Sequence, residues 1–389
     1  MTDGAAGRRK ALLAGLLAVS VTFAWQALVI HYTYAGNWSA WFCTGGNLPQ
    51  PPLAASEHLY VFKRSNGYDG QYYHYIAHDP FCRRETDRYL DAPRLRYRRI
   101  LMPGLAYLAA MGQDRAIDAA VFAVNLFAIF MGVYWSSRYA VHWGYGAAWG
   151  LLFLLVPAVL VSLDRFVVDP ALAALTVGFA LYVIEDNPPG VFAVLLFAPL
   201  ARETGVVLVA AQCGSLLMQR RLRSFLLFAS SLLPALAWYA FVSTHVRAED
   251  TTRWFAWPPL ARMLRAMLHV TPYPFIPSVK STAQATDIMA FLGVLLAIAL
   301  GLYLPKLKLP LPFLFAMGFL AVFAALLGRP VWVDAFAFSR VVSPLVVLVA
   351  LSAYPARSWI RFLPLALIDP RIGLQLSYRL FLVAKALFT

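Results

Sequence analysis

Charged residues are scarce in this sequence. Asp, Glu, Lys and Arg make up 13% of its 389 residues, whereas 61% are hydrophobic and 15% aromatic. Soluble domains carry roughly 25% charged residues, so this composition excludes an ordinary soluble protein and predicts an all-α polytopic membrane protein. The net charge is +14, but no basic, aromatic-interleaved soluble module is present. Nucleic acid is therefore not expected as a partner, and the excess Lys and Arg are expected at the membrane faces.

Cysteine is also rare, and its spacing matches no metal-binding motif. Cys213 lies in an apolar run and is expected to be inert packing. Cys43 and Cys82 flank a polar stretch, and if that stretch is external, a disulfide between them would close it. The sequence also lacks internal repeats, low-complexity tracts and a second soluble domain.

The apolar runs predict the membrane topology. Residues 11–30 follow the basic Arg8, Arg9 and Lys10 and are long enough to span, which places the N-terminus in the cytoplasm. Residues 100–112 are apolar, but at ~1.5 Å per residue they reach only about 20 Å of a ~30 Å core, so an interfacial helix is expected there. The further predicted spans are 116–135, 146–162, 168–185, 190–202, 204–218, 224–244, 287–304, 311–327 and 340–355.

This count of about ten spans follows the positive-inside rule. It leaves two long external segments, 32–115 and 245–286, and places the loop with Arg220, Arg221 and Arg223 in the cytoplasm. Residues 1–355 then form one transmembrane domain. Basic residues among apolar ones in the tail, 356–389, predict a cytoplasmic interfacial helix.

The first external segment contains the polar stretch 66–80. If residues 70–79 are helical, Gln71, His74 and His78 share one face. Asp69 then lies in the first turn, where it either takes part in the chemistry of the protein or simply caps the helix.

Several ionisable residues fall at predicted membrane depth, where such groups are costly and often mark a site. On the predicted topology they all open on the same face as Asp69. The alternative for each is a solvated helix end or a structural ion pair, for example Arg202 and Glu203 with Asp164 or Arg165. Carboxylates and arginines at the outer face would suit a substrate that combines an anionic phosphate with a hydroxyl nucleophile. The residues are Asp164, Arg165, Asp169, Arg202, Glu203 and Arg340.

Five segments, in order, resemble the GT-C superfamily of membrane glycosyltransferases, which use polyprenyl-phosphate sugars. Tyr68-Asp-Gly-Gln-Tyr-Tyr-His-Tyr-Ile-Ala77 is similar to the YDGxxYxxIA element of uncharacterised bacterial members. Arg98-Arg-Ile-Leu-Met-Pro-Gly-Leu-Ala-Tyr-Leu108 is similar to the RxxxYP-type interfacial helix, and Ala201-Arg-Glu-Thr204 resembles the charged break between middle helices. Ser162-Leu-Asp-Arg-Phe-Val-Val-Asp-Pro170 resembles the LDP element of the aminoarabinose and protein O-mannosyl transferases. Ser339-Arg-Val-Val-Ser-Pro344 resembles the RYxxP element, with Val341 in place of Tyr.

The resemblance implies an inverting glycosyltransferase in the inner (plasma) membrane, with its active site on the periplasmic or external face. It implies Asp69 as the general base, and Arg340, Arg202 and Arg99 around the phosphate of the donor. Asp169 would orient the sugar or the acceptor, and Gln71 with His74 would hydrogen-bond the sugar. The remaining substrate-binding candidates are Arg98, Asp164 and Glu203. The donor would be a polyprenyl-phosphate sugar and the acceptor a lipid, a glycan or a protein, with membrane lipids around the chain.

One departure from the family concerns metals. The first external segment has no acidic Asp-x-Asp or Asp-Glu pair, only Asp69 with the neutral Gln71. No metal ligand is therefore assigned and no cofactor is expected with certainty, although His74 and Asp79 leave ligands for a divalent cation.

Two other classes of protein remain open on the sequence. A secondary transporter or lipid flippase for an anionic substrate would also carry charges at membrane depth, but related halves and a midplane site are expected of it. A non-catalytic assembly or receptor subunit would need only the external segment and would tolerate loss of Asp69.

Overall fold

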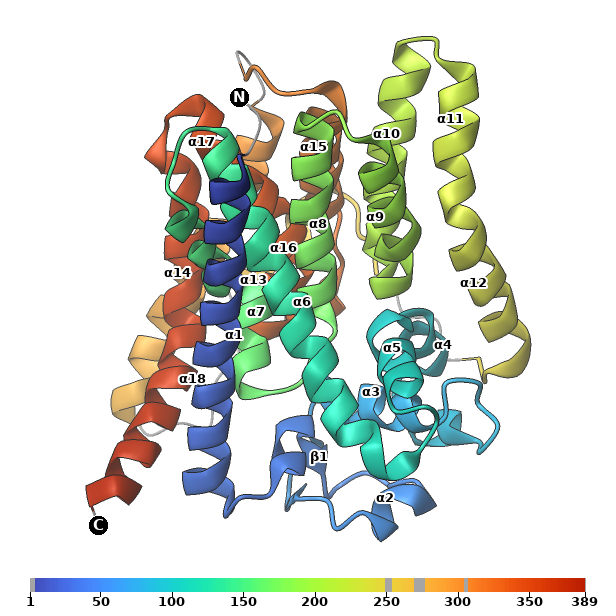
Figure 1. Cartoon of the computed structure of the whole chain (residues 1–389). Coiled ribbons are helices and arrows are strands. Elements are labelled where there is room, and N and C mark those ends of the chain that lie inside the picture. Colours follow the sequence, from blue (N-terminus) through green and yellow to red (C-terminus); the bar gives the residue numbers. More distant parts are fainter. Residues whose placement is uncertain (1–3, 249–253, 269–276, 304–306, 389) are drawn as a thin grey trace.

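The protein is a bundle of helices with a small folded cap at one end (Figure 1). The computed structural model describes residues 4–248, 254–268, 277–303 and 307–388. Five helical stretches in it are long and apolar enough to cross a membrane, and a bent pair would make a sixth. The all-α prediction is confirmed, and these helices are typical of a multi-pass membrane protein. The five are α1 (Ala5–Tyr34), α6 (Asp114–His142), the run of α11 (Leu222–Ala229), η5 (Ser230–Leu232) and α12 (Leu233–His245), α14 (Pro277–Leu302), and α16 (Ala335–Leu351) with α17 (Ala353–Ala356).

The remaining apolar helices are shorter or bent. The bent pair is η3 (Ala147–Leu155) and α7 (Pro157–Asp164), which meet at 64°. A break between the two middle helices was predicted near Arg202, and α9 does end at Ala201. The short helices do not reach the length of a full span. The predicted number of about ten membrane crossings therefore remains a proposal. The short helices are α8 (Asp169–Ile184), α9 (Pro188–Ala201), η4 (Glu203–Gly205) with α10 (Val206–Met218), and α15 (Leu311–Ala325).

The cap, residues 35–113, joins α1 to α6 and lies at the lower end of the bundle in Figure 1. The apolar segment 100–112 forms only α5 (Leu101–Ala109), too short to span, as predicted. Two strands of two residues each, β1 (Thr44–Gly45) and β2 (Val61–Phe62), pair in parallel. The cap helices are η1 (Trp38–Phe42), α2 (Pro52–Ser56), α3 (Asp69–His78), η2 (Thr86–Tyr89), α4 (Pro93–Arg98) and α5.

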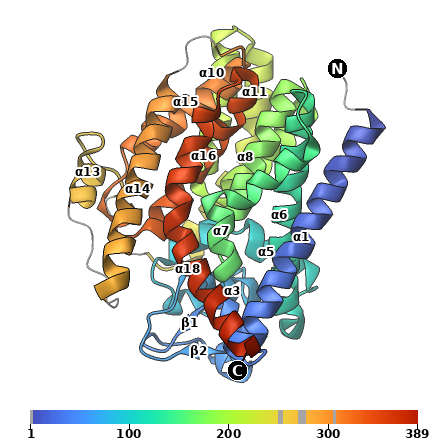
Figure 2. The ribbon, with the colours of Figure 1, turned by 90° about the vertical axis from the view of Figure 1, so that its left-hand side faces the viewer.

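The C-terminal segment lies elsewhere than the sequence predicts. The tail 356–389 was expected to form an interfacial helix at the cytoplasmic face, but α18 (Leu363–Phe388) runs along the bundle beside α14, α1 and α7 (Figure 2). Arg371 donates to Asp287 of α14 at 2.8 Å, and Arg379 donates to Asp164 of α7 at 2.7 Å. These basic side chains therefore pair with buried acids of the bundle.

Two further expectations concern segments of the chain and cysteines. The segment 245–286, predicted to be external, contains α13 (Ala261–Leu268) and the start of α14, while 249–253 and 269–276 lie outside the described residues. Two short 3-10 helices, η6 (Arg329–Val331) and η7 (Trp359–Phe362), complete the fold.

The expected disulfide is not formed, because Cys43 and Cys82 are free thiols. Cys82 lies beside Tyr97 within the cap.

A close helix contact makes the first structural prediction. Gly150 of η3 packs so tightly on α6 that an added Cβ would lie 2.6 Å from the Cα of Ser137 and closer still to its backbone nitrogen. Gly150→Ala should therefore force the backbones apart and destabilise the protein by about 1–3 kcal/mol. Thermal unfolding of the purified protein in detergent measures this. Gly146→Ala is the matched control, because a Cβ at Gly146 meets nothing within 4 Å; equal unfolding temperatures for the two variants would contradict the prediction.

Candidate functional site

Helix α3 presents Asp69 to the bundle. The N-cap residue is Tyr68, and no side chain caps this end of the helix. Asp69 is the first helical residue, so it does not act as a simple N-cap. Gly70 lets this end of α3 approach the bundle, because an added Cβ would lie 2.8 Å from the carbonyl oxygens of both Phe42 and Phe166. The carboxylate of Asp69 is thus held where the cap meets the transmembrane helices.

Two arginines hold the Asp69 carboxylate. Arg96 of α4 donates to its Oδ1 at 2.9 Å, and Arg340 of α16 donates to its Oδ2 at 3.0 Å. Arg340 also donates to Asp169 at the start of α8, at 2.9 Å. Arg202, at the break between α9 and α10, forms an ion pair with the same Asp169. Four predicted site residues, from α3, α8, α16 and the α9–α10 break, therefore meet in one network.

A second set of contacts continues this network through Tyr73. Arg99 donates from Nε and Nη2 to the two carboxylate oxygens of Glu203, at 2.9 and 2.6 Å. The buried Tyr73 hydroxyl accepts from Arg99 at 3.0 Å and from Arg96 at 3.3 Å. The buried charge cluster is defined here as Asp69, Tyr73, Arg96, Arg99, Asp169, Arg202, Glu203 and Arg340.

The charges of the buried charge cluster are nearly balanced. Its members include four guanidinium groups and three carboxylates, and a fourth carboxylate, the partly exposed Asp91, pairs with Arg96 from outside. Burial alone raises the pKa of Asp69, but the charges of Arg96 and Arg340 outweigh it and hold that pKa well below its usual range. Asp69 is therefore ionised near neutral pH, and the arginines around it are available to a second anion only in competition with it.

Sequence reasoning missed two members of the buried charge cluster. The hydroxyl of Tyr73 accepts from Arg96 and Arg99, and the Arg96 guanidinium also lies over the Tyr73 ring, 5.5 Å from its centre. Arg96 lies in a run rich in arginine, from which only Arg98 and Arg99 were selected. Its i, i+3 spacing from Arg99 was the available signal, since that spacing places two side chains on one helix face.

Other predicted site residues lie outside the cluster. The side chain of Gln71 joins two loop segments: its Oε1 accepts from the Gly45 amide at 3.0 Å and its Nε2 donates to the Asn66 carbonyl at 2.8 Å. Asp164 accepts from Arg165 at 2.6 Å and from Arg379 of α18. These contacts describe residues that hold the cap loop and the C-terminal helix in place.

Arg98 differs from its neighbours. Its guanidinium lies 5.6 Å from the centre of the Tyr239 ring, and its buried Nε has no hydrogen-bond partner. Within the described part of the chain, no carboxylate pairs with it. Arg98 is thus an arginine beside the buried charge cluster with free hydrogen-bonding capacity.

His74 belongs to a second group of side chains. On the face of α3 that carries His74 and His78, these two imidazoles meet Glu57 and Asp118, and one ligand atom from each of the four residues lies within 4.8 Å of the others. Burial raises the pKa of Glu57 to about 7, although the charge of His74 partly opposes this rise. The sequence predicted the shared face of the two histidines, and the structure adds the carboxylates that face them.

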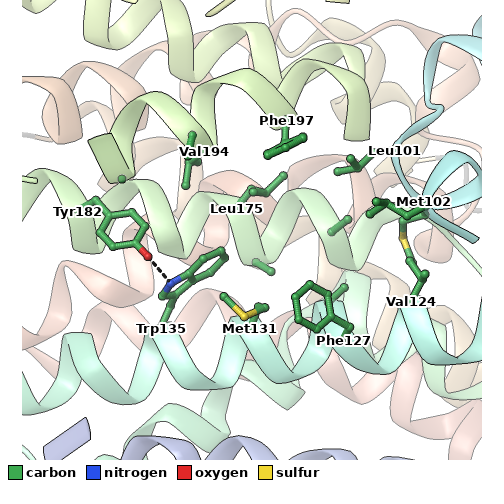
Figure 3. Close-up of a pocket in the computed structure, with 16 residues that line it drawn as sticks. Leu101, Met102, Val124, Phe127, Met131, Trp135, Leu175, Tyr182, Val194 and Phe197 are labelled. Atoms are coloured by element: carbon green, nitrogen blue, oxygen red, sulfur yellow. Dashed lines mark hydrogen bonds between the residues drawn. The ribbon is translucent and has the colours of Figure 1, made fainter. Parts of the chain in front are cut away.

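An apolar groove of about 360 Å³ lies between α5, α6, α8 and α9 (Figure 3). Trp135 and Tyr182 mark one end, and their side chains share a hydrogen bond of 3.1 Å. Leu101 and Met102 mark the other end, two and three residues after Arg99. The groove lining also includes Ala171, two residues after Asp169. The groove therefore runs along the bundle, and its lining includes close chain neighbours of Arg99 and Asp169.

Comparison with known proteins places no relative beside this chain. No protein-family model, no curated protein and no solved structure matches it.

A buried carboxylate with two guanidinium partners predicts a stability effect. Asp169→Asn leaves Arg202 and Arg340 without the charge that both share, and breaking a buried pair in this way costs about 3–5 kcal/mol. The unfolding temperature of the detergent-solubilised variant should fall accordingly. Asp91→Asn removes a carboxylate that is 46% exposed and should cost no more than about 1 kcal/mol. An equal fall in unfolding temperature for the two variants would show that the buried charge of Asp169 contributes no more to stability than the exposed charge of Asp91.

Proposed function

We propose that this protein is an inverting glycosyltransferase that moves a sugar from a polyprenyl-phosphate donor to an acceptor hydroxyl at the outer face of the membrane. The observation that carries the proposal is an apolar groove whose lining begins two residues along the chain from Arg99 and from Asp169 of the buried charge cluster. A lipid-borne sugar phosphate needs both parts: an apolar channel for the prenyl chain and cations for the phosphate. The family resemblance of the sequence motifs supports the same conclusion.

The proposed topology places the cap outside the cell membrane. The start of α1 and the turn between α10 and α11, with Arg220, Arg221 and Arg223, lie at the end of the bundle opposite the cap (Figure 1). Basic residues are retained on the cytoplasmic side, so this end is proposed to be cytoplasmic and the cap periplasmic or external. Residues 1–355 would then cross the membrane about ten times if the short and bent helices are included. Helix α18 would return along the bundle to the cap side.

The donor is proposed to bind along the groove. Its prenyl chain would contact the apolar lining, where Phe127 and Phe197 are exposed at the surface of the bundle. The phosphate would then lie near Leu101, three residues after Arg98, whose guanidinium has no carboxylate partner in the described chain. Arg98 is therefore proposed as the first phosphate ligand, followed by Arg99, Arg202 and Arg340, which must exchange a carboxylate for the phosphate.

Asp69 is proposed as the general base. The acceptor oxygen forms a bond to the anomeric carbon while the bond from that carbon to the phosphate oxygen breaks, and the electron pair leaves with the phosphate. The acceptor proton passes to Asp69, and attack opposite the leaving group inverts the anomeric centre. In the free protein Asp69 is a weak base because Arg96 and Arg340 lower its pKa. A bound phosphate competes for Arg340, and a carboxylate that loses a guanidinium partner becomes a stronger base. Asp169 would then retain Arg202.

Replacement of the proposed base tests the function directly. Asp69→Asn should lower kcat by about 10²–10⁴-fold, the usual contribution of general base catalysis, while the protein remains folded and inserted. The measurement is sugar transfer from a panel of polyprenyl-phosphate sugars to membrane acceptors. Asp186→Asn, at an exposed position in the turn after α8, should retain wild-type turnover. Wild-type-like transfer by Asp69→Asn would refute the base assignment, and transport of the lipid without transfer would favour a flippase.

The phosphate assignment gives a separate prediction. Arg98→Ala should raise the KM for the donor by about 10- to 100-fold, because a hydrogen bond to a charged group contributes roughly 1.5–3 kcal/mol, and should change kcat much less. Arg88→Ala, which removes an exposed arginine paired with Glu85, is the control. Steady-state kinetics with varied donor concentration separate the two parameters. A fall in kcat with an unchanged KM would exclude Arg98 from the phosphate site.

A further inference from the structure

The second face of α3 carries a compact set of nitrogen and oxygen ligands. His74 and His78 are one helical turn apart, so their side chains project from the same face. Glu57 approaches them from the segment after α2, and Asp118 approaches from the first turns of α6. The Nε2 atom of His74 lies 2.7 Å from Asp118 Oδ1, and the Nε2 atom of His78 lies 3.2 Å from Glu57 Oε1.

These contacts are satisfied without a metal only if one of the two carboxylates carries a proton. The two Nε2 atoms face each other at 3.2 Å. If both carried a proton, two N–H groups would face each other, which is repulsive. If one is bare, its lone pair faces a carboxylate oxygen, either Asp118 or Glu57. A cation placed among the four groups would accept lone pairs from both imidazoles and both carboxylates at once.

The surroundings fix His78 as metal-binding histidines are usually fixed, and ring stacking holds His74. The Nδ1 atom of His78 lies 3.0 Å from Asp114, which in turn accepts from Arg84 at 3.0 Å. A carboxylate on the second ring nitrogen sets the tautomer that leaves Nε2 free for a metal. The His74 ring stacks on Phe42, with 4.0 Å between ring centres and 11° between planes, so its Nε2 is aimed into the cluster. The Nδ1 atom of His74 is buried without a partner.

We propose that Glu57, His74, His78 and Asp118 bind one divalent transition-metal ion of the zinc type. Two imidazoles and two carboxylates suit Zn²⁺ or a neighbouring first-row ion, whereas Ca²⁺ and Mg²⁺ prefer oxygen ligands alone. Four protein ligands form a closed site, which is typical of a structural metal. The ligands come from the α2 segment, α3 and α6, so the ion joins the cap to the bundle.

This site is separate from the buried charge cluster. His74 follows Asp69 by five residues on the same helix, which corresponds to about 140° of rotation and ~7.5 Å of rise. Asp118 is 41% exposed at its side chain and leaves a path for the ion from solvent. The proposal therefore does not rest on the proposed transfer reaction, and its test needs no substrate.

Zinc binding by the full-length protein is the experiment. The chain is purified in detergent without a polyhistidine tag, stripped with a chelator, dialysed against Zn²⁺ alone and analysed by elemental mass spectrometry. One zinc per chain is expected, together with a higher unfolding temperature than that of the stripped protein. Replacement of the zinc by Co²⁺ should give the visible absorption bands of a four-coordinate site.

Ligand variants decide the assignment. His74→Ala and His78→Ala should lose the bound zinc, and His142→Ala, which removes a histidine at the far end of α6, should keep it. If the buried histidine variants do not fold, Glu57→Gln and Asp118→Asn, at partly exposed positions, should still lower zinc affinity by at least tenfold. Asp114→Asn should lower it by about 10- to 100-fold through the loss of the ring orientation. A stripped wild-type chain that takes up no zinc, or folded ligand variants that keep one equivalent, would overturn the proposal.

Discussion

The interaction on which the site depends is the double ion pair of Arg340. This arginine of α16 donates to Asp69 of the cap and to Asp169 of α8, so one side chain joins the cap to two helices of the bundle. Charges removed from water are costly unless each finds a partner. The buried charge cluster meets that demand with alternating carboxylates and guanidinium groups, and the relative position of cap and bundle follows from it. The same pairing keeps Asp69 ionised and pointed inward.

The cap uses both faces of α3 in different ways. The Asp69 end contacts the arginines of α4 and α16, whereas the face with His74 and His78 contacts Glu57 and Asp118. Gly70 permits this because backbone carbonyls of η1 and of the loop before α8 approach the helix closely. A helix of ten residues is marginal in isolation. Contacts on both faces therefore supply the order that a short helix lacks and hold the carboxylate in register with the bundle.

Much of this arrangement could be predicted from the sequence, and the reason differs from residue to residue. Asp169, Arg202 and Arg340 stood out because ionisable groups at helix ends are costly in a membrane. The number of predicted spans between them placed all three at the same end of the bundle. The partners could not be assigned, because the sequence does not tell a structural pair from a binding residue. Gln71 illustrates this: its amide was expected near the sugar and instead bridges Gly45 and Asn66. The prediction for the tail failed because basic residues in an apolar helix look the same in the sequence whether they lie at a membrane surface or pair with buried acids. Arg371 and Arg379 pair with buried acids.

The two partners of Asp69 differ greatly in their distance along the chain, and this has a consequence for biogenesis. Arg96 follows Asp69 by 27 residues, whereas Arg340 follows it by 271. A ribosome that delivers the chain from its N-terminus therefore supplies the local arginine first, and most of the helices must be inserted before the second one exists. Arg96 can neutralise the carboxylate throughout this interval. The junction of cap and bundle is thus completed only after α16 has been made, so a nascent chain arrested before α16 would carry a cap without its contact to Arg340.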